Sequence, residues 1–112
     1  MKGTHLGEFE ELVLLTVGSL YEAAYGVAIM DEIIKQTNRG VNISAVHAVL
    51  QRLEKKGLVK SEMGGATAER GGRRKRYFHL TRAGKKALDD SMELRMQLYK
   101  SIPDLSFKFS ST

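Results

Sequence analysis

Apolar residues recur every three or four positions near the start of the chain, which is the spacing of one face of an amphipathic helix. The apolar members of this pattern are Phe9, Leu12, Val13, Val17 and Leu20. Glu8, Glu10 and Glu11 stand in the first turn, where the helix dipole favours negative charge. We therefore expect a first helix that begins at Glu8 and weakens near residues 18–19, a Gly-Ser pair.

Two further helical patterns follow. The second opens at Tyr25, and residues 38–40 (Asn-Arg-Gly) predict its end because Asn and Gly adopt the left-handed backbone of a helix C-terminus. A side-chain oxygen of either Asn42 or Ser44 can cap the third helix, and Gly57 is expected to follow its end. The apolar residues of the third pattern are Ile43, Val46, Val49, Leu50 and Leu53. Its other face is small and polar at the start and basic near the end.

After the third helix the spacing changes to the alternation of a β-strand. Residues 58–63 can form one strand, and residues 77–80 form a better one. The segment between them contains GGATAERGGRRKR, which is rich in glycine and basic residues. The pattern predicts a hairpin with a long, flexible, basic tip.

A last helix is expected from the capping residue Thr81 to Ile102, where Pro103 stops it. These 22 residues would span about 33 Å. One stripe of this helix contains Leu88, Met92, Arg95, Tyr99 and Ile102. Its apolar surface exceeds what a small core can bury, so we expect part of it to contact another chain. Packing against the first helix is the alternative. The tail, residues 103–112, either docks as an extended segment or is disordered, with disorder slightly favoured.

The composition is that of a soluble globular domain, with 112 residues, 42% hydrophobic and 28% charged. No apolar run is long enough to span a membrane, and the acidic N-terminus lacks the apolar segment of a secretory signal. The chain contains no Cys, which excludes disulfides and cysteine metal sites and agrees with a reducing compartment. We therefore expect a cytoplasmic protein with no membrane segment.

Positive charge is concentrated in the middle of the chain. The formal net charge is +5, but residues 1–40 carry −3, residues 41–86 carry +9 and residues 87–112 carry −1. Localised charge of this kind favours a polyanionic partner, although many basic segments are only solvated. The order of helix, helix, helix, strand, basic loop, strand and long helix is typical of a winged helix-turn-helix. The expected fold class is mostly α with a small β-hairpin wing (α+β).

In that fold the third helix enters the major groove of double-stranded DNA and the wing lies along the backbone. Gln51 can pair bidentately with adenine, whereas Arg52 and Lys55 are expected to contact phosphate. The candidate DNA-binding residues are Tyr25, Asn42, Ser44, Ala45, His47, Ala48, Gln51, Arg52 and Lys55, followed in the wing by Arg70, Arg73, Arg74, Lys75 and Arg76. The alternatives are a solvated helix face, a packing role for Tyr25, and a wing that attracts phosphate without sequence preference.

The segments AYGVAIMDEI, SAVHAVLQRLEKKGLV and GGRRKRYFHLTRAGKKAL together resemble the PadR-like transcriptional regulators, over roughly residues 6–100. The resemblance implies a DNA-binding domain at residues 1–80, a dimerisation helix at 81–102 as in the short subfamily, and repression. This chain has His47 and Ala48 where the family usually has Tyr followed by Pro or a small residue, so the operator sequence is not transferable. It has no Trp, whereas some short relatives hold flat ligands between tryptophans, so multidrug sensing is not implied.

The resemblance also implies a homodimer in which the first and last helices of the two subunits meet. The expected interface residues are Phe9, Leu88, Met92, Arg95, Met96, Tyr99 and Ile102. A small-molecule effector of unknown identity would bind between the last helices and shift the population of dimer geometries. Met92, Met96 and Tyr99 are adaptable candidates for that site, and core packing explains them equally well.

Catalysis has little support in the sequence. The motifs of P-loop, dinucleotide-binding, serine-hydrolase and zinc-protease sites are absent. His5, His47 and His79 lie far apart without carboxylates at metal-ligand spacing. We expect no enzyme activity, no metal and no cofactor. Two other functions stay open: an RNA- or ribosome-associated basic adaptor that uses the wing, and a protein-interaction module that keeps the fold without specific DNA binding.

Overall fold

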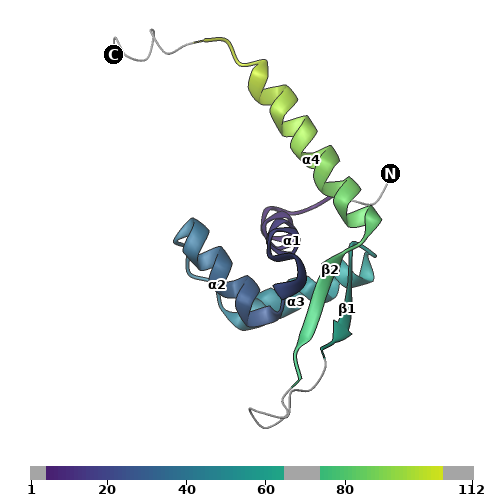
Figure 1. The fold of residues 1–112 in the computed structure, drawn as a ribbon. Coiled ribbons are helices and arrows are strands. Elements are labelled where there is room, and N and C mark those ends of the chain that lie inside the picture. Colours follow the sequence, from purple (N-terminus) through teal and green to yellow (C-terminus); the bar gives the residue numbers. More distant parts are fainter. Residues whose placement is uncertain (1–4, 65–73, 105–112) are drawn as a thin grey trace.

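Three helices and a β-hairpin form the body of the protein, and a fourth helix extends away from it (Figure 1). The computed structural model describes residues 5–64 and 74–104. Its elements are α1 (Glu8–Leu20), a 3₁₀ turn (Tyr21–Ala23), α2 (Gly26–Thr37), α3 (Ile43–Lys55), β1 (Val59–Met63), β2 (Arg76–Leu80) and α4 (Arg82–Lys100). The expected winged helix-turn-helix, mostly α with a small β-hairpin, is confirmed.

Local signals fix the boundaries of α2 and α3. Asn38 ends α2 in the left-handed conformation, with φ at 57°, and Gly57 follows α3 with φ at 78°. At the start of α3, the Asn42 side chain accepts a hydrogen bond from the Ala45 backbone N–H at 2.8 Å. Asn42 is therefore the N-cap of α3, and Ser44 is not; Ser44 lies on the exposed side of the helix.

The core lies where α1, α2 and α3 meet the hairpin. Its largest fully buried side chains are Leu14, Ile29, Ile33, Leu50, Leu53 and Leu58. The two strands pair antiparallel, from Val59 opposite Leu80 to Met63 opposite Arg76. β1 begins one residue later, and β2 one residue earlier, than the alternation predicts. On β2, Phe78 points into the core and closes it.

α4 packs against the body mainly through its first turns, and Ser91 and Arg95 farther along it bond to α1. Thr81 caps it, accepting a hydrogen bond from the Gly84 N–H at 3.0 Å, and the Thr81 hydroxyl donates to the Gly57 carbonyl at 2.6 Å. Gly84 lies so close to the start of β1 that a Cβ there would stand 2.0 Å from the Leu58 carbonyl oxygen. Leu88 is the last buried residue of the helix, and from residue 92 onward every residue of α4 is exposed.

α4 ends at Lys100, two residues before the predicted end at Ile102. The N–H groups of Ser101 and Ile102 each bond to a carbonyl three residues back, at 3.1 Å. The proline ring of Pro103 disfavours helical backbone at the residue before it, so the chain tightens into a 3₁₀-type turn there. With 19 residues, α4 is about 28 Å long. The predicted tail lies, from residue 105 onward, outside the described residues.

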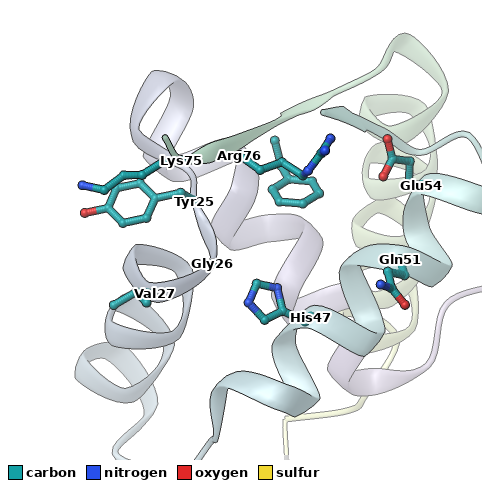
Figure 2. Close-up of a pocket in the computed structure, with 9 residues that line it drawn as sticks. Tyr25, Gly26, Val27, His47, Gln51, Glu54, Lys75 and Arg76 are labelled. Atoms are coloured by element: carbon teal, nitrogen blue, oxygen red, sulfur yellow. The ribbon is translucent and has the colours of Figure 1, made fainter. Parts of the chain in front are cut away.

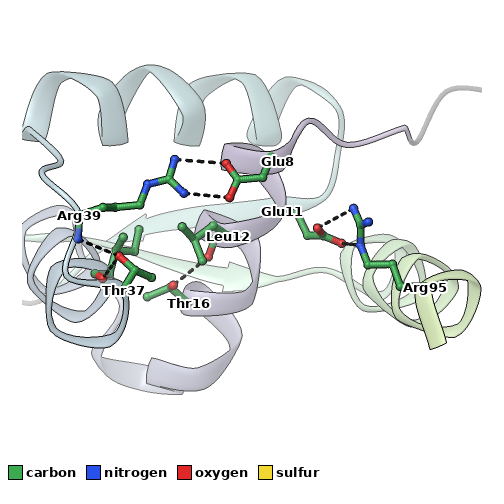
Figure 3. A network of polar contacts seen from close by, with 8 residues as sticks. Glu8, Glu11, Leu12, Thr16, Thr37, Arg39 and Arg95 are labelled. Atoms are coloured by element: carbon green, nitrogen blue, oxygen red, sulfur yellow. Dashed lines mark hydrogen bonds and ion pairs between the residues drawn. The ribbon is translucent and has the colours of Figure 1, made fainter. Parts of the chain in front are cut away.

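The acidic first turn of α1 connects to two other helices (Figure 3). Glu11, whose side chain is 9% exposed, accepts hydrogen bonds from Ser91 and Arg95 of α4, with the Arg95 Nη2 at 3.0 Å. Glu8 pairs with both terminal nitrogens of Arg39, just after α2, at 2.8 and 3.2 Å. Burial raises the pKa of the Glu11 carboxyl, but the hydrogen bonds from α4 outweigh it and hold the pKa below its usual value.

Glu10, in the same turn, holds the end of α3. Its carboxylate lies 3.0 Å from the Lys56 Nζ and 3.3 Å from the Arg52 Nε, and it accepts a hydrogen bond from the Gly7 backbone N–H. Burial raises the pKa of Glu10, while these hydrogen bonds lower it to below its usual value. The three carboxylates, expected only to favour the helix dipole, therefore connect α1 to α2, α3 and α4.

Candidate nucleic-acid interface

The exposed face of α3 carries most of the residues predicted to read bases. Ser44, His47, Ala48, Gln51 and Lys55 are all exposed, opposite the buried residues Val46, Val49, Leu50 and Leu53. Ala45 is half-buried at the edge of this face. The face thus offers a hydroxyl, an imidazole, a methyl and an amide group. Such groups contact base edges when a helix lies in a major groove.

Arg52 and Asn42 already have partners within the chain. The Arg52 Nε lies 3.3 Å from the Glu10 carboxylate, although the Arg52 side chain is 56% exposed. The side-chain oxygen of Asn42 is occupied by the helix cap. Among residues 5–64 and 74–104, Lys55 has no carboxylate within 4.0 Å. Lys55 can therefore bind phosphate directly, whereas the charge of Arg52 is shared with Glu10.

The start of α2, the exposed face of α3 and the stem of the hairpin enclose an open cavity of about 600 Å³ (Figure 2). Its predicted DNA-contact residues are Tyr25, His47, Gln51, Lys75 and Arg76. Residues from three separate segments of the sequence therefore meet at one surface. Helix groups that can read bases stand here beside cations that can bind phosphate.

Tyr25 connects α2 to the stem of the hairpin. Its ring meets the ring of Tyr77 edge-on with centroids 5.6 Å apart, and the Lys75 Nζ lies 4.4 Å from the centre of the Tyr25 ring. Alongside, the Phe78 N–H donates to the Ala24 carbonyl at 2.8 Å. The packing role that the sequence left open for Tyr25 is present, and it places Lys75 over the start of α2.

Glu54 was not among the predicted site residues, yet it lines the same cavity. Its carboxylate accepts a hydrogen bond from the Ser61 hydroxyl at 2.8 Å, and the Ser61 oxygen accepts one from Arg76 at 2.9 Å. The chain of contacts joins the last turn of α3 to both strands of the wing. The only signal in the sequence was an acidic residue within a strongly basic segment.

The basic residues of the wing are described in part. Arg74, Lys75 and Arg76 are exposed at the stem, and within the described ranges none has a carboxylate within 4.0 Å. Arg70 and Arg73 lie outside the described residues. The stem alone therefore supplies three cations beside the face of α3.

The outer half of α4 presents an apolar surface. An open groove of about 660 Å³ is lined by Met92, Arg95, Met96, Leu98, Tyr99 and Ile102. Two predicted interface residues lie elsewhere: Leu88 is 6% exposed and belongs to the core of its own chain, and Phe9 is half-buried. The Arg39 guanidinium covers Phe9, at 5.7 Å from the ring centre. The stripe predicted on the last helix thus faces the core near residue 88 and the outside farther along.

Within the part of the chain that the structure describes, no three His, Asp or Glu side chains are grouped so that they could hold a metal ion. In the same residues, no helix is both long and apolar enough to cross a membrane.

These features define the class of the molecule: a winged helix-turn-helix protein with an exposed third helix, a basic hairpin stem and a long C-terminal helix. Residues 12–90 match the family described as transcriptional regulator PadR-like. Because the match covers well over half of the chain, the protein belongs to the PadR-like family of DNA-binding transcriptional regulators.

Solved structures share the fold. A PadR-like transcription factor from Bacteroides fragilis is 22% identical with a TM-score of 0.70, over 83% of this chain and 84% of that chain. A PadR-like transcriptional regulator from Bacillus cereus is 18% identical with a TM-score of 0.69, over 83% and 85%. The hsRosR-S1 complex structure is 26% identical with a TM-score of 0.68, over 95% and 87%. No curated protein matches the chain.

Proposed function

We propose that the protein binds a pseudo-palindromic site in double-stranded DNA as a homodimer and represses transcription by occluding a promoter. The observation that carries this proposal is the cavity in which His47 and Gln51 of α3 face Lys75 and Arg76 of the wing. Phosphate contacts fix register and base contacts supply specificity, so a specific binder needs both kinds of group side by side.

In this proposal residues 1–80 form the DNA-binding domain. Ser44, His47, Ala48 and Gln51 read base edges, with Ala45 and Asn42 at the margin of the same face. Six residues contact the DNA backbone: Tyr25, Arg52, Lys55, Arg74, Lys75 and Arg76. Arg70 and Arg73, from the sequence between the two strands, join them in this proposal. The cations of the stem, which have no carboxylate within 4.0 Å among the described residues, supply affinity, and the face of α3 supplies sequence preference.

The dimer forms through residues 81–102. Exposed apolar side chains crowd the outer half of α4, where Leu94 is 56% exposed, Leu98 59% and Tyr99 70%. A second copy of α4 is a partner of matching character, and two-fold symmetry then presents two α3 helices to two half-sites. Among the residues named for this interface, Met92, Met96, Tyr99 and Ile102 form the contact, with Arg95 at its edge. Phe9, half-buried under Arg39, lies outside it.

Regulation follows from the same helices. A small-molecule effector in the groove around Met92, Met96 and Tyr99 favours one arrangement of the two α4 helices. It thereby favours one distance between the two α3 helices that contact the DNA. The protein acts in the cytoplasm, with no cofactor and no enzymatic step.

A fluorescence-anisotropy titration tests the proposal. Full-length protein is titrated against the DNA upstream of its own gene and against a scrambled duplex of equal length, each at several salt concentrations. We expect a preference of about 10³-fold for the upstream DNA. Equal and steeply salt-dependent binding to both duplexes would reduce the function to electrostatic attraction. Absence of binding at moderate salt would favour the protein-interaction module, an alternative supported by His47 at the position of the usual family tyrosine.

A further inference from the structure

The first residue of α2 lies unusually close to a side chain of α3. Gly26 is buried, and the His47 imidazole points toward it across the cavity (Figure 2). A Cβ built on Gly26 would stand 2.7 Å from the His47 Cε1 and 3.2 Å from its Nε2. The ring of His47 thus occupies space that exists only because residue 26 has no side chain.

Two other glycines show what is particular about this contact. A Cβ at Gly84 would meet the backbone carbonyl of Leu58 at 2.0 Å, so the chain itself would have to move. A Cβ at Gly40, in the segment between α2 and α3, would meet nothing within 4 Å. At Gly26 the obstructing atoms form the tip of a side chain that can rotate. A methyl group there displaces the imidazole and leaves the backbone in place.

We propose that Gly26 is a specificity-determining residue that acts through His47, by fixing where the imidazole stands on the reading face of α3. The inference rests on the proposed function, because it requires His47 to contact bases. Gly26 itself touches no DNA and is a positioning residue. The base pair that His47 selects therefore depends on the size of residue 26 on the neighbouring helix.

A purely structural role for Gly26 makes a different prediction. If the glycine served only to pack α2 against α3, an added methyl would lower stability and would leave the order of preferred DNA sequences unchanged. The measurement that separates the two roles is therefore base preference at individual positions, with stability followed in parallel.

The experiment selects binding sequences from a pool of random duplexes with the full-length chain. Five proteins are compared: wild type, Gly26→Ala, His47→Ala, the double variant, and Gly40→Ala as the matched control. We expect wild type and Gly40→Ala to select one sequence. Gly26→Ala and His47→Ala should lose preference, by about tenfold, at the same base pairs of each half-site. The double variant should match His47→Ala alone, because without the imidazole the methyl has nothing to displace.

Each other outcome overturns a defined step. If Gly26→Ala selects the wild-type sequence while His47→Ala does not, the inference fails and the proposed function stands. The same holds if Gly26→Ala does not fold, because the backbone and not the imidazole then takes the strain. If His47→Ala selects the wild-type sequence, His47 reads no base and the inference fails at that point. If the wild type itself selects no sequence, the proposed function fails and the inference fails with it.

Discussion

Basic side chains in two regions of this molecule have opposite surroundings. Around the first turn of α1, Arg39, Lys56 and Arg95 each lie within about 3 Å of a glutamate. At the wing stem and on the face of α3, Lys55 and Lys75 have no carboxylate partner among the described residues. A count of charges does not separate these two sets. Carboxylate partners do: within the described residues the cations beside the face of α3 have none, although exposed cations elsewhere, such as Lys35, also have none.

The difference teaches that the acidic first block of the sequence has a structural purpose. Glutamates of α1 pair with cations that face the body, whereas the cations of the hairpin stem have no carboxylate partner among the described residues. The pairing also ties α1 to the other helices. In the proposed function, affinity for a polyanion and cohesion of the helices therefore depend mostly on different cations, and Arg52 belongs to both groups.

The largest effect is expected from reversing one charge on the unpaired side. Lys75→Glu places a carboxylate among the phosphate contacts and should weaken binding to every duplex by about 100-fold, because like charges at an interface are strongly unfavourable. The salt dependence of binding should fall by at least one unit of slope. Anisotropy titrations at several salt concentrations measure both.

Lys35→Glu is the matched control for Lys75→Glu. It makes the same change in net charge at an exposed position in the last turn of α2. Equal loss of affinity in the two variants would show that only net charge matters, and would remove the distinction between the two regions.

Breaking the contact between Glu11 and α4 should change both the stability of the protein and the direction of α4. Glu11→Ala leaves Ser91 and Arg95 without their buried acceptor and should lower the free energy of unfolding by about 1–2 kcal/mol. Because this contact lies beyond the last buried residue of α4, its loss should also broaden the range of half-site spacings that the dimer accepts. Thermal unfolding, and binding to duplexes with half-sites at varied spacing, test the two effects.

Glu8→Ala is the control for Glu11→Ala. It breaks an exposed ion pair in the same turn that does not touch α4, and such pairs contribute little. A spacing preference that broadens equally in both variants would contradict the role of Glu11 in setting the direction of α4.

Acidic pH should remove the stabilisation of the fold that Glu10 and Glu11 provide. The pKa values of Glu10 and Glu11 lie below their usual value in the folded protein, so their stabilisation is fully present above the unfolded-state pKa of about 4.3. It is lost as the pH falls through the lower folded-state values. The difference in Tm between wild type and Glu11→Ala should therefore be constant from pH 7 to 5 and shrink below about pH 4.3. A difference that persists undiminished at pH 2.5–3 would contradict the ionic nature of the contact.

The smallest effect is expected at the boundary between the regions. Lys55 is unpaired, whereas Arg52 is held by Glu10. Lys55→Ala should weaken binding by about fivefold, with a loss of one unit of salt slope, and Arg52→Ala by less than twofold. An equal or greater loss from Arg52→Ala would contradict the idea that the ion pair with Glu10 weakens the phosphate contact of Arg52.

Much of the fold could be predicted because its signals are local. Asn38, Asn42 and Gly57 mark helix ends through their own backbone and side-chain chemistry. The exposed face of α3 followed from the spacing of its apolar residues, so Ser44, His47 and Gln51 were placed on it correctly.

What the sequence did not reveal depends on contacts between distant segments. The side chains that bond to Glu10 and Glu11 lie 42 to 84 positions away from them in the sequence. The local pattern around the two glutamates therefore indicated only negative charge near the start of a helix. For the same reason Glu54 was overlooked. Leu88 was assigned to a partner chain because an apolar stripe does not show where the core beside it ends.

α4 is a lever. Its first turns are held between Thr81 and Leu88, where Gly84 leaves no room for a side chain beside the Leu58 carbonyl. Farther along, Ser91 and Arg95 hold it through Glu11 of α1. In a pair of such molecules joined at the far ends of α4, a tilt of one α4 by about 10° about the joined end moves its body by about 5 Å, because the helix is about 28 Å long. That travel exceeds the 3.4 Å rise between successive base pairs. A small tilt of α4 is thus enough to move α3 away from the base pair that it contacts in the proposed complex.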